Sequence, residues 1–302
     1  MDTSIRIAFL GLGNMGTPLA QLLVQDGFSL TVWNRSREKM APLAAAGART
    51  AATPSEAAGH ADLVMTLLGD DHAVESVTLG PDGLLAGLRP GAVHVGMSTV
   101  APGLSSRLAQ AHAEHGSTYF ACPVFGRPDA AAARKLWLAP AGPEDVFARI
   151  RPVLERMGRG MSYMGADPAA GNVAKLAGNF LIASAIEAMA EAFTLVEKHD
   201  LAPAQFLEMI DQAVLQSPLY RRYGTLLAEG QYAPPGFELR WGLKDVRLVR
   251  QQADLSASPM PLADLIHEHL LSSVAQGRSL WDWVAMGEVV RERAGLPGRR
   301  PE

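Results

Sequence analysis

The sequence predicts an α/β domain with a parallel sheet over residues 1–166 and an all-α domain over residues 167–302, joined by a long interdomain helix. Three observations predict this. Short apolar strands alternate with amphipathic helices as far as Tyr163, the pattern of a parallel sheet wound with helices. From Pro168 to His199 no proline or turn cluster interrupts a helical pattern, and only helical patterns follow. A chain of 302 residues also favours two domains over a single core.

Composition favours a protein with small-molecule partners. Of the residues 48% are apolar, the formal net charge is −4, and the basic residues are scattered. Such a chain presents no basic patch for nucleic acid or an anionic membrane. The single cysteine suits a reducing compartment, and the first apolar run is too short for a signal peptide or a membrane span. We therefore expect a cytoplasmic protein.

The first predicted strand leads directly into a glycine-spaced turn. Residues 5–10 are apolar apart from Arg6, and Gly11-Leu12-Gly13-Asn14-Met15-Gly16 follows. In a G-x-G-x-x-G turn the first glycine bends the chain, the second lets the backbone approach a pyrophosphate, and the third packs the helix on the strand. The phosphates then lie at the helix N-terminus. Three spaced glycines also occur in ordinary loops, but the strand before them and the amphipathic residues 17–25 after them favour a dinucleotide site.

The end of the second predicted strand bears on the choice of cofactor. Residues 28–33 form this strand, and Asn34-Arg35-Ser36-Arg37 follows. Sites that prefer NAD(H) place an acidic residue here to bind the ribose 2′-hydroxyl. Arg35 and Ser36 instead offer a guanidinium and a hydroxyl, which suit a 2′-phosphate. We expect NADP(H) to be preferred over NAD(H); without the glycine turn, solvated arginines opening the next helix would be the better interpretation.

Later strands and helices follow the same pattern. Ser98-Thr99 comes directly after a predicted strand, where it either caps the helix over residues 103–114 or contacts a substrate, two compatible roles. The other predicted strands cover residues 61–68, 92–96, 119–124, 135–139 and 161–163, and a helix covers 143–157. In the second domain the predicted helices cover residues 168–199, 203–213, 219–228, 239–253, 262–276 and 282–293.

The long helix carries a polar stripe near its start. Asn172, Lys175 and Asn179 are three and four residues apart, so they project from one face. A lysine in such apolar surroundings either extends its amine to water or serves a site. Beside a nicotinamide, an ammonium can protonate the alkoxide formed by hydride transfer, and a neutral amine can take the hydroxyl proton in the reverse direction.

These motifs, in this order, resemble the β-hydroxyacid dehydrogenase family. That family includes 3-hydroxyisobutyrate dehydrogenases, glyoxylate and succinic semialdehyde reductases and, more distantly, 6-phosphogluconate dehydrogenase and the imine reductases. The resemblance runs almost from end to end of the chain. It is carried by Gly11–Gly16, Asn34-Arg35-Ser36, Ser98-Thr99, Pro123-Val124 with Gly126, Gly171 with Lys175 and Asn179, Lys244-Asp245, and Asp282.

The resemblance implies an NAD(P)-binding Rossmann domain followed by a helical domain. It implies that Lys175 is the catalytic lysine and that Asn179 positions the substrate. Together with the turn and the strand end above, the expected cofactor-binding residues are Gly11, Leu12, Gly13, Asn14, Met15, Gly16, Asn34, Arg35, Ser36, Leu67, Leu68, Thr99 and Lys244. The expected substrate-binding residues are Ser98, Thr99, Phe125, Gly126 and Arg127.

One segment departs from the family pattern. Many relatives carry Asp-Ala-Pro-Val-Ser-Gly-Gly, whose serine and glycines hold the substrate carboxylate, whereas residues 121–128 here are ACPVFGRP. Phe125 removes a hydroxyl and adds a ring, which favours a bulkier or less polar substrate. Arg127 can instead supply a bidentate contact to a carboxylate.

We therefore predict an NADPH-dependent oxidoreductase that interconverts a small carbonyl compound and its hydroxy form. One alternative is an imine reductase on the same fold, which Lys175 disfavours, because imine reductases commonly replace it, and Phe125 mildly favours. The other is a cofactor-binding scaffold without catalysis. No histidine spacing is typical of a metal site, so none is expected. A homodimer is expected through the long helix, because its apolar surface exceeds what the shorter helices cover.

Overall fold

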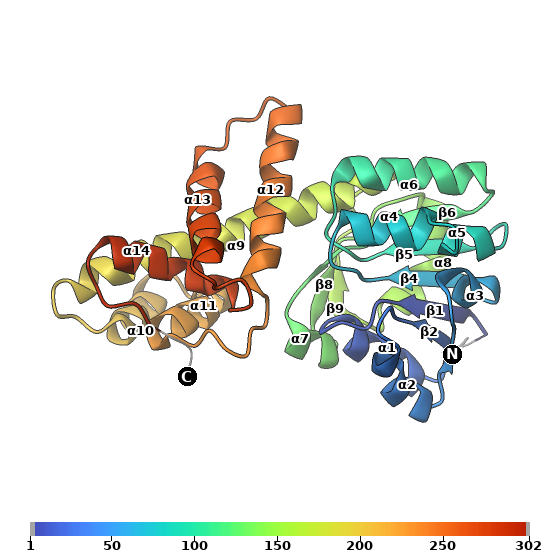
Figure 1. Cartoon of the computed structure of the whole chain (residues 1–302), viewed down its shortest axis with the longest axis horizontal. Helices are drawn as coiled ribbons and strands as arrows, with labels where there is room; N and C mark the ends of the chain where they lie inside the picture. Colours follow the sequence, from blue (N-terminus) through green and yellow to red (C-terminus); the bar gives the residue numbers. More distant parts are fainter. Residues whose placement is uncertain (1–3, 300–302) are drawn as a thin grey trace. The chain divides into compact units, whose positions relative to one another are not determined.

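The computed structural model describes residues 4–299. The chain divides into two compact units, residues 1–175 (unit 1) and 176–302 (unit 2), and each is described by itself. Unit 1 holds the strands found within residues 4–299, and unit 2 is helical, as Figure 1 shows in the change from blue and green to yellow and red.

A parallel sheet of six strands forms the centre of unit 1. Its order is β3-β2-β1-β4-β5-β6, so the chain winds from the middle to one edge and then from the middle to the other. The direction reverses between β1 and β4, and open sheets of this kind bind ligands at the carboxyl ends of the strands beside such a reversal. The strands are β1 (Arg6–Leu10), β2 (Ser29–Trp33), β3 (Arg49–Thr50), β4 (Leu63–Thr66), β5 (Val93–Gly96) and β6 (Thr118–Ala121).

Helices cover both faces of this sheet. On β1, Ile7 and Phe9 pack in the core cluster that holds α1 (Gly16–Gln25) and α8 (Glu144–Leu154), whereas Ala8 and Leu10 pack with α3 (Pro54–Gly59) and α5 (Leu84–Gly87). Burial on both faces explains why these strands are almost continuously apolar. The other helices of unit 1 are η1 (Arg37–Met40), α2 (Ala41–Ala45), α4 (Asp71–Leu79), α6 (Pro102–Glu114) and α7 (Pro128–Ala132).

A second, three-stranded sheet corrects two predictions. The strand predicted over 119–124 is confirmed only as far as Ala121, where β6 ends. The next strand, β7 (Val124–Phe125), pairs in the other sheet with β8 (Leu136–Leu138). Pro123 stands between them and has no N–H to continue a ladder. The last strand, β9 (Gly158–Met161), starts earlier than the predicted 161–163. Its glycines hide it from a propensity argument, yet a Cβ at Gly160 would lie 2.5 Å from the Trp137 ring, so β9 packs where a side chain does not fit.

Helix α9 (Pro168–Glu197) begins as the sequence predicts. Asp167 Oδ1 accepts a hydrogen bond from Ala169 N at 2.9 Å, and Pro168 is the first helical residue. The helix is long and apolar enough to cross a membrane by length and composition alone. Half of its most apolar window is nevertheless buried inside the protein, and it carries buried Asn172, Lys175 and Asn179. These features are typical of a core helix in a soluble protein.

Unit 2 packs shorter helices around the rest of α9. Its buried core includes Ile186 and Met189 of α9 together with Leu243, Leu270 and Trp283. The predicted helix 282–293 is in fact two elements, with Asp282 accepting from Val284 N at the start of the first. The elements are α10 (Pro203–Ala213), α11 (Pro218–Glu229), α12 (Leu239–Leu255), α13 (Pro261–Ala275), η2 (Trp283–Met286) and α14 (Gly287–Arg293).

Candidate functional site

The glycine turn has the geometry that its spacing predicts. Gly11 has φ of +102°, and a Cβ there would lie 2.3 Å from Leu67 O. A Cβ at Gly16 would lie 1.9 Å from Gly11 O, so this glycine allows α1 to pack against the turn. Gly13, in contrast, is exposed and would place a Cβ in open space. The three glycines therefore divide into two that the protein's own packing requires and one that leaves the backbone accessible from outside.

The start of α1 suits a bound anion. Its N-cap residue is Met15, and no side chain caps the helix there. Backbone N–H groups at such a terminus, together with the helix dipole, favour phosphate. The residues present therefore fit the pyrophosphate of a dinucleotide, which would lie against Gly13 and the first turn of α1.

Asn34 and the end of β4 hold the turn in place. Asn34 Oδ1 accepts a hydrogen bond from Leu12 N at 2.9 Å, and Gly11 N donates to Trp33 O at 3.0 Å. Leu67 and Leu68 line the other side, where a Cβ on Gly11 would touch both of them. Arg35, next after Asn34, is exposed, and Ser36 stands at the N-cap of η1 without a side-chain capping bond. The predicted cofactor residues of unit 1 thus follow the carboxyl ends of β1, β2 and β4, except for Thr99, which follows β5.

Ser98 joins this group from the end of β5. Its Oγ accepts a hydrogen bond from Leu68 N at 2.8 Å. The expectation that Ser98-Thr99 caps the following helix is wrong, because the N-cap residue of α6 is Ala101, whose N–H donates to the Asp71 carboxylate at 3.1 Å. Asp71 was not predicted. A carboxylate in the first turn of a helix is common, because it interacts favourably with the helix dipole, and the sequence does not indicate which chain segment it meets.

Phe125 and Lys175 come together in unit 1. Lys175 Nζ lies 4.2 Å from the centroid of the Phe125 ring, a cation–π contact, and Lys175 is only 8% exposed. Gly126 has φ of +141°, and a Cβ there would lie 2.4 Å from the Leu136 side chain. Arg127 is half-buried, and two of its three guanidinium nitrogens, Nε and Nη1, are shielded from solvent.

Asn172 connects the first turns of α9 to the segment that follows β5. Its Oδ1 accepts a hydrogen bond from Val100 N at 3.2 Å, and its Nδ2 donates to Ser105 Oγ at 2.9 Å. Sequence reasoning placed Asn172 on the polar stripe but assigned it no role. Asn172 is fully buried, and because buried amides are normally hydrogen-bonded, this burial is the signal that points to such a role.

The other predicted residues, Asn179 and Lys244, lie in unit 2. Asn179 Nδ2 donates to Asp245 Oδ2 at 2.6 Å, and Lys244 Nζ is 2.9 Å from Asp245 Oδ1. Asp245 is 1% exposed, so its charge is held by these two partners. A buried carboxylate is rare unless it is paired, so the burial of Asp245 is the signal that points to its pairing with Asn179 and Lys244.

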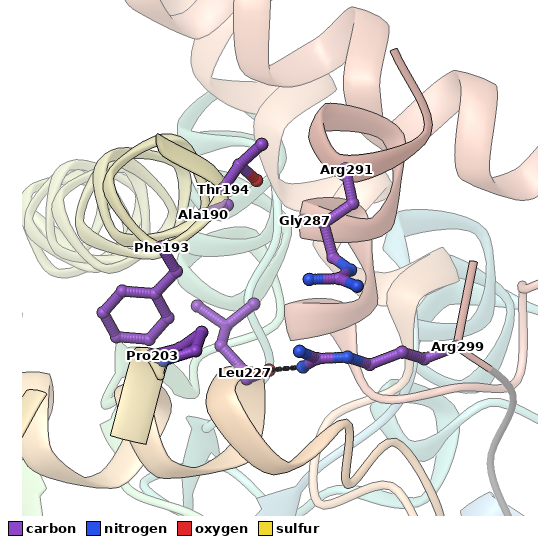
Figure 2. A pocket seen from close by; sticks show the side chains of 8 residues that line it. All are labelled: Ala190, Phe193, Thr194, Pro203, Leu227, Gly287, Arg291 and Arg299. Atoms are coloured by element: carbon purple, nitrogen blue, oxygen red, sulfur yellow. Dashed lines mark hydrogen bonds between the residues drawn. The ribbon is translucent and has the colours of Figure 1, made fainter. Parts of the chain in front are cut away.

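Two further features of the molecule are structural. The pocket in Figure 2 lies in unit 2 and contains none of the predicted site residues; its two arginines, Arg291 and Arg299, pair with Glu197, and Arg299 also donates to Leu227 O at 2.6 Å. Cys122 is buried, and burial raises the pKa of its thiol. Within residues 4–299 no group of three His, Cys, Asp or Glu side chains is placed to hold a metal ion.

In the parallel sheet, the order in which the chain adds strands reverses between β1 and β4, and the glycine turn and the uncapped start of α1 follow β1. This arrangement defines a Rossmann-type nucleotide-binding domain. Comparison with family models agrees. Residues 6–165 match the model described as the NAD binding domain of 6-phosphogluconate dehydrogenase. Residues 169–290 match the model described as NAD-binding of NADP-dependent 3-hydroxyisobutyrate dehydrogenase. The chain belongs to the β-hydroxyacid dehydrogenase family, and it is an NAD(P)-dependent oxidoreductase of the 3-hydroxyisobutyrate dehydrogenase-like type.

Individual relatives cover nearly the whole chain. It is 42% identical over 287 residues to the uncharacterized oxidoreductase YfjR of Bacillus subtilis (strain 168), covering 95% of this chain and 100% of the relative. It is 30% identical over 288 residues to glyoxylate/succinic semialdehyde reductase 2, chloroplastic, of Arabidopsis thaliana, covering 95% and 80% respectively.

Solved structures show the same fold. The 3-hydroxyisobutyrate dehydrogenase of Mycobacterium tuberculosis, solved with L-serine, matches with a TM-score of 0.85 and 28% identity over 95% of this chain and 99% of that one. Imine reductase BcSIRED from Bacillus cereus BAG3X2 matches with a TM-score of 0.63 and 23% identity over 95% of this chain and 99% of that chain, a likeness of fold.

Proposed function

We propose that this enzyme is an NADPH-dependent reductase of a small aldehyde, semialdehyde or ketoacid, with Lys175 as its proton donor. The observation that carries the proposal is the position of Lys175: its amine is buried in the nucleotide-binding unit, against Phe125, on a helix turn that is bonded to the segment after Ser98. Buried titratable side chains are concentrated at functional sites, so a buried amine in this unit favours a role in the reaction.

The proposed chemistry divides between the cofactor and the protein. The nicotinamide, when bound, supplies the hydride. The Lys175 ammonium donates a proton to the developing alkoxide oxygen and stabilises its negative charge; in the oxidative direction the neutral amine takes the hydroxyl proton. Asn179, one turn further along α9, is proposed to position the substrate with its amide, and Lys244 to contact the cofactor from unit 2.

The preference for NADPH rests on Arg35 and Ser36. Both stand at the end of β2, the position from which Rossmann domains contact the adenosine ribose. An exposed guanidinium forms bidentate bonds to a phosphate, and no acidic side chain occupies residues 34–37 to bind a 2′-hydroxyl instead.

The substrate class follows from Phe125 and Arg127. Phe125 places a ring beside the proposed proton donor, so the group attached to the reacting carbonyl should be apolar or bulky. Arg127 supplies a positive charge two residues later, which suits a carboxylate further along the substrate. The same ring makes an imine the second candidate substrate, although a lysine is the less suitable group for that reaction.

A substrate panel tests this proposal. Purified protein is assayed with NADPH and with NADH against glyoxylate, succinic semialdehyde, an aryl-substituted ketoacid and a cyclic imine. We expect turnover of a carbonyl compound with NADPH, faster for the bulkier acids, and the variant Phe125→Ser should shift the preference toward glyoxylate. Turnover of the imine alone would replace the proposal with the second candidate, and no oxidation of NADPH with any compound would favour a cofactor-binding scaffold.

We also propose that the enzyme is a cytoplasmic homodimer that pairs through α9. Its single cysteine, buried in the fold, suits a reducing compartment. Exposed residues recur every three, four or seven positions along α9, as on a coiled-coil seam: Val173, Ala177, Leu181, Ala188, Glu191 and Leu195. Light scattering at micromolar concentration should give twice the mass of the 32.1 kDa chain, and Leu181→Glu should lower it. A wild-type monomer would contradict the proposal.

A further inference from the structure

We infer that Asn172 is a positioning residue, which holds the helix turn that carries Lys175 against residues 98–105 of unit 1. The inference rests on the proposed function of Lys175 as proton donor. Asn172 lies three residues before Lys175, so both project from the same face of α9. It is fully buried, and both ends of its amide form hydrogen bonds.

The two bonds of Asn172 join α9 to two points on another segment. Oδ1 accepts from Val100 N, directly after Ser98-Thr99, and Nδ2 donates to Ser105 Oγ in the first turns of α6. An amide can accept and donate at the same time, whereas an ionised carboxylate only accepts and an apolar side chain does neither. A pair of bonds with defined direction fixes both the rotation and the axial position of this turn of α9.

The anchor for these bonds is itself rigid. Ser105 is fully buried and hydrogen-bonded to Tyr119, which lies on β6 inside the sheet. One residue before Asn172, a Cβ at Gly171 would lie 2.9 Å from Ala139 O, so the helix approaches the backbone of unit 1 as closely as a glycine allows. The bonds of Asn172 therefore transmit the position of the sheet to the start of α9.

The lysine needs this support because of its own flexibility. Its amine stands at the end of a four-carbon stem, and proton transfer requires it within about 3 Å of the reacting oxygen. Displacement of a catalytic group by about 1 Å can reduce the rate by about 100-fold. The turn that carries the stem must therefore be fixed by something other than the lysine itself.

The experiment compares Asn172→Ala, Asn172→Asp and Ser105→Ala with the wild type, using succinic semialdehyde and NADPH. We expect Asn172→Ala to lower kcat per folded active site by about 10- to 100-fold while the NADPH Kd changes by less than about threefold. With NADPH deuterated at the transferred position, the isotope effect on kcat should be larger in Asn172→Ala than in the wild type. Asn172→Asp keeps the acceptor for Val100 and should recover part of the rate, and Ser105→Ala should lose less than Asn172→Ala.

The matched control is Thr194→Val on the same helix. Thr194 is also buried, and its hydroxyl meets no hydrogen-bond partner within the described residues, so kcat should stay at the wild-type value. A merely structural Asn172 would lower the Tm and leave kcat per folded site and the isotope effect unchanged, and that result would overturn the inference. If Lys175→Ala retains wild-type activity, the proposed function fails instead; if it is inactive while Asn172→Ala is fully active, only the present inference fails.

Discussion

The glycine turn and the segment around Phe125 are two functional regions of the same unit, and they are built differently. The turn is contained in six consecutive residues, and its shape is imposed by backbone contacts at Gly11 and Gly16. Phe125 meets Lys175 from a distant part of the chain, and the turn of α9 that carries Lys175 is bonded through Asn172 to Val100 and Ser105. The comparison teaches that the glycine turn can be recognised from consecutive residues, whereas the contact between Phe125 and Lys175 exists only after unit 1 is assembled.

The largest effect should come from the backbone requirement itself. Gly16→Ala places a methyl group 1.9 Å from Gly11 O, a contact that only a shift of α1 or the turn relieves. We expect a loss of stability of about 3 kcal/mol or more, or no folded protein at all. Chemical denaturation monitored by circular dichroism measures this directly.

Gly13→Ala is the matched variant, because its methyl group would meet nothing within the protein. Its Tm should stay near that of the wild type, while its NADPH Kd should rise by at least about tenfold because the methyl occupies the path of the pyrophosphate. Equal stability of the two alanine variants would break the distinction between packing glycines and a binding glycine.

Acid should weaken the side-chain-built region next. Beside Tyr119, which is bonded to Ser105, the side chains of Thr66, His94 and His112 form a buried chain of hydrogen bonds. Burial lowers the pKa of His112 from 6.5 to about 4 and that of His94 well below 6.5. Because the unfolded chain binds these protons at a higher pH than the folded one, stability is fully present above pH 6.5 and falls as the pH drops toward 4, by about 1.4 kcal/mol per pH unit for each histidine.

Urea denaturation at several pH values checks this. His112→Leu should flatten the slope between pH 6.5 and 4 even where its stability at pH 7 is lower, and His199→Asn, at an exposed position, should leave the slope as in the wild type. An unchanged slope in His112→Leu would show that the pair does not titrate as burial requires.

The smallest effect is expected at the end of β2. Arg35→Ala removes an exposed guanidinium and no packing, so stability should not change. Loss of a charged contact to the 2′-phosphate should raise the Kd for NADPH by about tenfold and leave the Kd for NADH unchanged. Titration of both cofactors by fluorescence measures the ratio, and equal wild-type affinity for the two would remove the role proposed for Arg35.

The same contrast explains how much the sequence predicts. The fold class is confirmed, including the glycine turn, the parallel sheet and the start of α9 at Asp167-Pro168, because each depends on local residue chemistry. The sequence does not predict that the strand ends before Pro123 or that β9 starts at Gly158, because tertiary pairing with β8 decides both. At the candidate site, the roles that the sequence assigns to Lys175, Asn179 and Arg35 stay predictions, and the sequence does not indicate which side chains these residues contact. Asp71, the bonds of Asn172 and the pairing of Asp245 with Asn179 all join residues far apart in the chain.

The most direct test of the central claim is single-turnover reduction of succinic semialdehyde by Lys175→Met, with NADPH binding measured on the same sample. Methionine keeps the unbranched shape of the side chain and removes the charge and the proton. We predict that the NADPH Kd stays within about threefold of the wild type, while hydride transfer slows by about 100- to 10,000-fold, the range typical of a lost general acid. Hydride transfer at the wild-type rate in this variant would contradict the assignment of Lys175 as proton donor.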